Sequence, residues 1–82
     1  LNGTRILVEP TPSSGPLVLR FSEVLKNASF QFLNLLGQIL QQESLSSDFI
    51  TSLDLSNYPN GIYFIRIQAK RNSVTKKVIL QK

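Results

Sequence analysis

The sequence predicts an all-β domain, an immunoglobulin-like antiparallel β-sandwich of about seven strands. Apolar residues alternate with polar ones along most of the 82 residues, and this period of two is typical of half-buried strands. Turn-forming residues separate the alternating segments at short intervals, as they do in sandwiches. A chain of this length makes one domain, residues 1–82, whose core is thin and must be closely packed.

The first two strands are expected on either side of a turn that is rich in proline. The first covers residues 5–9, and Pro10, Pro12 and Gly15 stop it. The second covers residues 17–21, with a large apolar side chain at every second position. One face of each strand is therefore expected to be buried.

The third and fourth strands are expected on either side of Gly37. The third centres on Phe30 and Phe32, and the fourth covers residues 38–43, which are less apolar and fit the edge of a sheet. The alternative is a helix over residues 30–42. Glycine in the middle of that helix would cost about 1 kcal/mol relative to alanine, and phenylalanine favours strands. We therefore expect a strand, a turn and a second strand.

The fifth and the last strands carry the same alternation. One face of residues 49–55 collects four side chains: Phe49, Thr51, Leu53 and Leu55. In the last strand three apolar residues share a face: Val74, Val78 and Leu80. Thr75 and Lys77 are expected on the opposite face.

Residues 61–68 form the strongest predicted strand, which starts at the tight turn Pro59-Asn60-Gly61. We expect one face to hold Tyr63, Ile65 and Ile67 and the other face to hold Phe64 and Arg66. In immunoglobulin-like sandwiches a tyrosine at this place buries its ring, and its hydroxyl reaches a backbone carbonyl of the preceding corner. A structural role is therefore expected for Tyr63 rather than contact with a ligand.

Charge is divided unevenly along the chain. Residues 1–54 hold three basic and five acidic residues, a net charge of −2, whereas residues 55–82 hold six basic residues and no acid, a net charge of +6. Such a basic end suits nucleic acid, anionic lipopolysaccharide or an acidic receptor. It equally suits a solvated edge strand, where lysine prevents pairing with other strands. The sequence leaves both interpretations open.

The composition argues against catalysis and against a cofactor. The chain has no Cys and no His, the residues that ligate zinc, haem iron or iron–sulfur clusters, and its five acids fall mostly at expected turns and strand ends. We expect no enzyme activity, no catalytic residue and no metal. No apolar run approaches the roughly 20 residues that cross a bilayer as a helix. The chain starts at Leu1 without a signal-peptide pattern, and we expect it to be cut from a longer secreted or surface protein.

Four stretches, in order, resemble the C-terminal sorting domains of the type IX (Por) secretion system of Bacteroidota. Val8–Gly15 resembles the proline-containing opening motif of this family, and Phe32–Gln38 resembles its turn with Asp or Asn three residues before Gly. Leu53–Ile65 resembles its "ID(L)S…GxYxV" motif, and Thr75–Lys82 resembles its basic, alternating ending. The residues that carry the structural part of these motifs are Pro10, Pro12, Gly15, Gly37, Asp54, Gly61 and Tyr63.

The resemblance implies a folded export signal. A cargo protein of a Gram-negative bacterium would reach the periplasm, and the outer-membrane translocon would recognise the domain. A surface sortase often then removes it and joins the cargo to anionic lipopolysaccharide. The residues expected to meet the translocon are Thr75, Lys76, Lys77, Val78, Ile79, Leu80 and Lys82, with the lysines as charged contacts and the free strand edge open to β-augmentation. Val78 and Leu80 also fit a role in the core.

The alternative is an extracellular immunoglobulin-like or fibronectin-like module for adhesion or carbohydrate binding. Such sites usually expose aromatic rings, and only Tyr58 and Phe64 are candidates. Nucleic-acid binding ranks third, because the basic residues of the second half lack interleaved aromatic residues for base stacking. We expect no nucleic-acid partner and no membrane-spanning segment.

Overall fold

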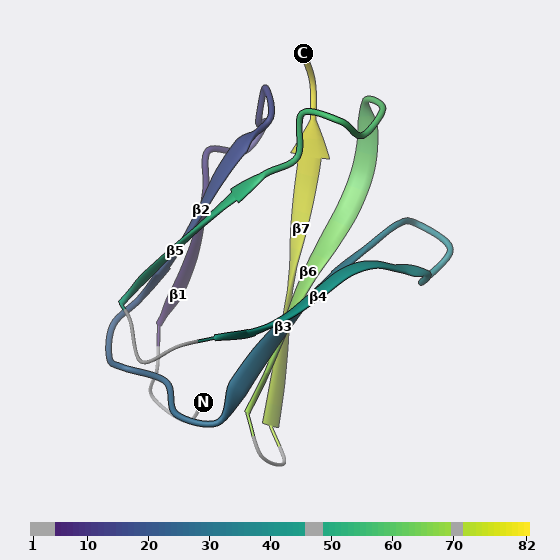
Figure 1. Cartoon of the computed structure of the whole chain (residues 1–82). Coiled ribbons are helices and arrows are strands. Elements are labelled where there is room, and N and C mark those ends of the chain that lie inside the picture. The colour runs from purple at the N-terminus through teal and green to yellow at the C-terminus, as the bar shows by residue number, and fades with distance from the viewer. Residues whose placement is uncertain (1–4, 46–48, 70–71) are drawn as a thin grey trace.

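The protein is an all-β sandwich of seven antiparallel strands in two packed sheets, as the sequence predicts. The computed structural model describes residues 5–45, 49–69 and 72–82 (Figure 1). Its strands are β1 (Ile6–Glu9), β2 (Pro16–Phe21), β3 (Ala28–Leu33), β4 (Ile39–Leu45), β5 (Ile50–Asp54), β6 (Gly61–Ala69) and β7 (Asn72–Leu80). Asp48 and the basic residues Lys70 and Arg71 lie outside the described residues.

The strands form a three-stranded sheet in the order β1-β2-β5 and a four-stranded sheet in the order β4-β3-β6-β7. Figure 1 shows the two sheets facing each other, with β7 (yellow) beside β6. The expected edge position of β4 is confirmed. The segment around Gly37 is a turn between two strands rather than part of a helix, as predicted. Within the described part of the chain, no helix has the length and apolarity needed to cross a membrane.

The core lies between the sheets and is built by alternate residues of each strand. The side chains with less than 2% exposure include two phenylalanines at the centre of β3, two leucines of β2 and the alternating residues of β6 and β7: Phe30, Phe32, Leu17, Leu19, Ile65, Ile67, Val78 and Leu80. Cross-strand pairing places Phe32 opposite Ile65 and Tyr63 opposite Val78. The period of two and the strand register therefore direct the same side chains inward.

Phe49 departs from the expected pattern. Pairing between β5 and β2 begins at Ile50, which lies opposite Arg20. Phe49 precedes the strand, and its side chain is 54% exposed, whereas Leu53 and Leu55 are buried and Thr51 is half-buried. The N–H of Phe21 still donates to the carbonyl of Phe49 at 2.8 Å, so the alternation continues to Phe49, but its side chain is exposed at the end of the strand instead of being buried.

Ser13 connects the two sheets at one end of the sandwich. Its N–H donates to the carbonyl of Ile79 at 2.7 Å, and its carbonyl accepts from the N–H of Gln81 at 2.8 Å, so it forms a short parallel bridge with the end of β7. Its hydroxyl donates to the carbonyl of Pro16 at 2.6 Å and accepts from the N–H of Gly15 at 3.0 Å. The side chain is fully buried. The segment before β2 is thereby fixed against the last strand of the other sheet.

Replacing Ser13→Ala is expected to destabilise the fold by about 1–3 kcal/mol, because it leaves the buried N–H of Gly15 and the part-buried carbonyl of Pro16 without a partner. Thermal or urea unfolding of the purified chain measures this. The exposed neighbour Ser14 provides the control, since Ser14→Ala should change the free energy of unfolding by less than about 0.5 kcal/mol. Equal stability of the two variants would contradict the role given to the hydroxyl.

Candidate recognition surface

Tyr63 closes the corner before β6, as the sequence predicts. Its hydroxyl donates to the carbonyl of Pro59 at 2.6 Å, and its ring stacks on Phe32 with 4.9 Å between centroids and 23° between planes. The side chain is buried. Both ends of the tyrosine are thus satisfied within the domain, which confirms its structural role.

Tyr58 belongs to the same aromatic cluster and is not an exposed platform. Its ring centroid lies 5.1 Å from that of Phe32 and 6.2 Å from that of Tyr63. Its hydroxyl accepts a hydrogen bond from Nε2 of Gln41 at 3.0 Å, and the residue is half-buried. One of the two aromatic candidates for carbohydrate binding is therefore engaged in packing.

Asp54 caps the turn that follows β5. Its Oδ1 accepts from the hydroxyl of Ser56 at 2.6 Å and from the N–H of Ser56 at 3.0 Å. These two hydrogen bonds lower the pKa of Asp54 from its usual 3.8. Desolvation opposes them, and the positive charge of Lys82 adds a lesser lowering effect on this pKa. Gly15 approaches the same turn: its φ is +142°, and a Cβ placed there would lie 3.1 Å from Cβ of Ser56. The motif residues Asp54 and Gly15 therefore meet at one corner.

Lys82 is engaged in this corner rather than free. Its ammonium donates to the carbonyl of Ser56 at 2.6 Å and to the carbonyl of Tyr58. The backbone N–H of Lys82 donates to Oδ1 of Asn60 at 3.0 Å. The residue that we expected to be a charged contact with a partner therefore also ties the segment after β7 to the turn before β6.

The other predicted recognition residues are divided between the two faces of β7. Thr75 and Lys77 are exposed on the outer face of the four-stranded sheet, and Ile79 is half-buried there. Lys76 points to the core side but is exposed, and it lines a hollow with Arg5. Val78 and Leu80 are 0% and 1% exposed and lie in the core. A partner of the intact domain can thus touch the three residues of the outer face and also Lys76. It cannot touch Val78 or Leu80, which are buried.

Within the part of the chain that the structure describes, one edge of β7 has backbone groups without a hydrogen-bond partner. Ser13 bonds the carbonyl of Ile79 and the N–H of Gln81, so these two residues direct their backbone groups away from β6. Alternate residues of a strand point the same way, so the N–H and C=O groups of Thr75 and Lys77 also face away from β6. The bridge to Ser13 occupies only the end of this edge.

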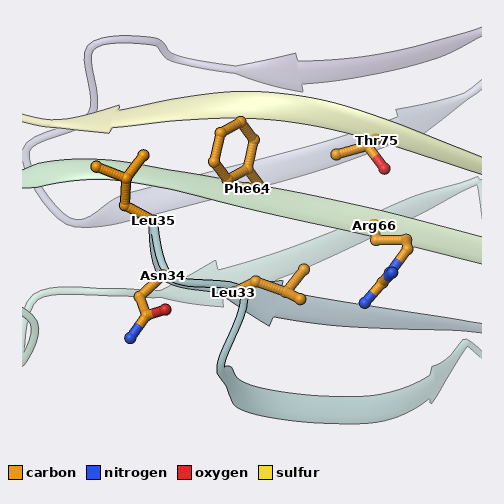
Figure 2. Close-up of a pocket in the computed structure, with 7 residues that line it drawn as sticks. Leu33, Asn34, Leu35, Phe64, Arg66 and Thr75 are labelled. Carbon is orange, nitrogen blue, oxygen red and sulfur yellow. The ribbon is translucent and has the colours of Figure 1, made fainter.

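The turn around Gly37 presents apolar side chains that sequence reasoning did not select. Oδ1 of Asn34 accepts from the N–H groups of Leu36 at 3.0 Å and Gln38 at 2.9 Å, and Gly37 has a φ of +85°. Leu35 and Leu36 at this turn are 66% and 84% exposed. The turn borders a hollow of about 280 Å³ on the outer face of the sheet, lined by Leu33, Asn34, Leu35, Gly37, Phe64, Arg66 and Thr75 (Figure 2).

The described part of the chain shows no acidic partner for Arg66 or Lys77 on this face. Arg20 forms an ion pair with Glu9 elsewhere, with 2.6 Å between Nε and Oε1. Nε of Arg66 instead donates to Oε1 of Gln31 at 2.8 Å. No cluster of three or more metal-binding side chains occurs within the part of the chain that the structure describes. The arrangement is suited to recognition of an anionic partner.

Comparison with known proteins assigns most of the chain to a family. Residues 8–81 match the model of the family described as "Secretion system C-terminal sorting domain". No curated protein matches the chain. The matched range includes the end of β1 and the whole of the other six strands. It contains the opening segment, the turn around Gly37, the Tyr63 corner and most of the closing segment.

Replacing Tyr63→Phe should lower the free energy of unfolding by about 1 kcal/mol, because the carbonyl of Pro59 loses its partner while the ring stays in place. Tyr63→Ala should cost about 3–5 kcal/mol, since it also removes the buried ring. Chemical denaturation of the two variants separates the hydroxyl from the ring. Wild-type stability of Tyr63→Phe would show that the hydrogen bond to the corner contributes nothing.

The lowered pKa of Asp54 predicts a pH dependence of stability. A carboxylate with a lowered pKa in the folded state stabilises the fold above its unfolded pKa, near 3.8, and loses that contribution as the pH falls through the folded value. Wild-type protein should therefore lose more stability between about pH 6 and pH 3 than Asp54→Asn, which keeps an acceptor but cannot titrate. Unfolding curves at both pH values test this. Glu43→Gln, which removes an exposed carboxylate from β4, controls for net charge. The same loss in Asp54→Asn as in wild type would refute the assignment.

Proposed function

Because this chain belongs to the family of secretion system C-terminal sorting domains, we propose that it is a folded export signal at the C-terminal end of a longer cargo protein. Members of this family are sorting signals and not enzymes, and their presence marks secreted or cell-surface proteins of Bacteroidota. The proposal is that the domain directs its cargo from the periplasm across the outer membrane through the type IX secretion system. The match over residues 8–81 is the observation that carries it.

The fold supports an export signal that is recognised in its folded form. The four stretches that resemble the family are not four separate contact sites, because three of them meet at one end of the sandwich through Ser13, Gly15, Asp54, Tyr63 and Lys82. Most of their polar groups are occupied within the domain. A protein that binds this signal would therefore recognise the folded surface that these contacts hold in place, rather than an extended peptide.

We propose β7 as one element that the translocon contacts. Its exposed positions Thr75, Lys76 and Lys77 combine positive charge with a free strand edge, and both features suit a partner that adds a strand and carries acidic side chains. Val78 and Leu80 take part only by completing the core. Removal of the domain by a surface sortase and attachment of the cargo to anionic lipopolysaccharide belong to the same proposal.

Export of a fluorescent cargo tests the proposed function directly. The cargo carries a signal peptide in front and residues 1–82 behind, in a bacterium that has the type IX system. We expect fluorescence outside the cell with the domain and periplasmic retention without it. Mass spectrometry of the exported cargo, with and without the surface sortase, shows whether the domain is removed and whether lipopolysaccharide is attached. Equal export of cargo with and without the domain would refute the proposal.

Blocking the free edge of β7 should impair export. Thr75→Pro removes an N–H that faces away from β6, a place where a strand tolerates proline, and the loss of the edge hydrogen bond should reduce external cargo by about tenfold. Thr75→Ala removes the side chain and keeps the N–H, so it should export normally. Comparable export by both variants would exclude strand addition at this edge.

Reversing the charge of β7 gives a separate test. Lys76→Glu/Lys77→Glu should reduce export while the melting temperature stays close to that of wild type, because both side chains are exposed. Circular dichroism of the purified domain measures stability in parallel with export. A large loss of stability would assign these lysines to the fold instead of to recognition.

A further inference from the structure

A second, small apolar cluster lies outside the core. Leu33 is only 6% exposed, yet it does not belong to the core between the sheets. It pairs with Phe64 across the strands, and both are on the outer face of the four-stranded sheet. Leu35 from the turn lies beside them (Figure 2). An outer sheet face that faced only water would need none of these side chains.

These residues form a hollow rather than a filled cluster. Its volume is about 280 Å³, larger than the roughly 150 Å³ cavity that holds a benzene ring in another protein. Leu33, Leu35 and Phe64 make its apolar wall, and Thr75 lies at its margin, whereas the Asn34 side chain points away from these residues (Figure 2). One large apolar side chain of another molecule fits such a space.

The hollow is held in shape before anything binds. Asn34 fixes the turn through its hydrogen bonds to Leu36 and Gln38, and its Nδ2 also donates to Oε1 of Gln38 at 2.6 Å. The positive φ of Gly37 lets the chain reverse there. A wall that is already ordered loses little conformational entropy on binding, which favours affinity.

Positive charge borders the hollow, and no acidic side chain among the described residues of this face neutralises it. Arg66 lines it, and its guanidinium is oriented by the hydrogen bond to Gln31, which leaves N–H groups available for a carboxylate. Lys77 pairs with Phe64 across the strands, so a second cation lies on the other side of the ring. The alternate residues of β3, β6 and β7 that share this face include no acid. An apolar hollow between two cations suits an apolar group joined to an anion.

We propose that this hollow binds a segment of a partner protein that inserts a Leu- or Phe-sized side chain next to Leu33 and Phe64 and places an adjacent carboxylate on Arg66. The inference deepens the proposed function and rests on it where it assigns that segment to the export machinery. The occupant is a protein segment and not a lipid surface, because the hollow takes a single side chain and an oriented guanidinium matches the planar geometry of a carboxylate. A lipid surface would be better matched by a broader basic cluster.

Peptide binding by the 82-residue chain tests the hollow itself. The probe is a displayed library of random peptides, followed by titration of the selected sequences as synthetic peptides. We expect selected peptides to share a large apolar residue next to Asp or Glu. Leu35→Ser and Arg66→Gln should each weaken binding by about tenfold, and Arg66→Lys should restore it only in part, because lysine lacks the paired donors.

Matched variants elsewhere on the surface control for apolar area and charge. Leu7 is 54% exposed on β1, and Arg5 is exposed beside it, so Leu7→Ser and Arg5→Gln should bind the peptides like wild type. Melting curves confirm that every variant is folded. Selected peptides without an acidic residue, or equal binding by wild type and Leu35→Ser, would overturn the proposal. So would binding only to vesicles that contain phosphatidylglycerol, because it would assign the face to a membrane.

The export assay separates this inference from the proposed function. If wild type exports the cargo and Leu35→Ser or Arg66→Gln reduces export, both are supported. If these variants export as well as wild type, the inference is overturned in its assignment to the export machinery and the proposed function stands. If wild type itself fails to export, the proposed function fails, and the peptide titrations alone decide what the hollow binds.

Discussion

The contact between Ser13 and the end of β7 is the constraint on which the arrangement depends. This backbone bridge links the two sheets. It joins Ser13 to Ile79 and Gln81, which are 66 and 68 positions later in the sequence. Its two backbone bonds occupy one end of the β7 edge, and its hydroxyl fixes the start of β2. The free edge, the Asp54 corner and the position of Lys82 are all set around it.

Much of the fold follows from local pattern. Alternation alone predicts all seven strands and the inward face of β6, because a strand has one period and a thin domain has one core. The Tyr63 corner was predictable from a turn and a tyrosine two residues later. Phe49 continues this alternation, and its carbonyl accepts from the N–H of Phe21, yet its side chain is exposed because it lies at the end of β5. Local pattern gives the period of a strand but not how far the core extends along it.

The contacts between distant segments were not predictable. Nothing in the sequence around Ser13 indicates that its backbone will pair with β7, and nothing around Lys82 indicates that its ammonium will bind two carbonyls of the preceding corner. The hollow on the outer face was missed for the same reason. Leu33 looks like the last residue of a core strand, and only the pairing of β3 with β6 places it against Phe64 and outside the core.

The two faces of β7 have different environments, one buried in the core and one exposed. Its inner residues Val78 and Leu80 complete the core, while its outer residues Thr75 and Lys77 leave charge and backbone groups exposed. Under the proposed function, substitutions on the outer face would change recognition with little effect on folding, whereas loss of the whole strand would change both.

The bridge to Ser13 also bears on when the domain can fold during synthesis. A nascent chain that stops before residue 79 has no partner for the Ser13 N–H and lacks Leu80 in its core. The sandwich can therefore close only after residues 79–81 have left the ribosome, and a product truncated before them would lack the surface that these contacts hold in place.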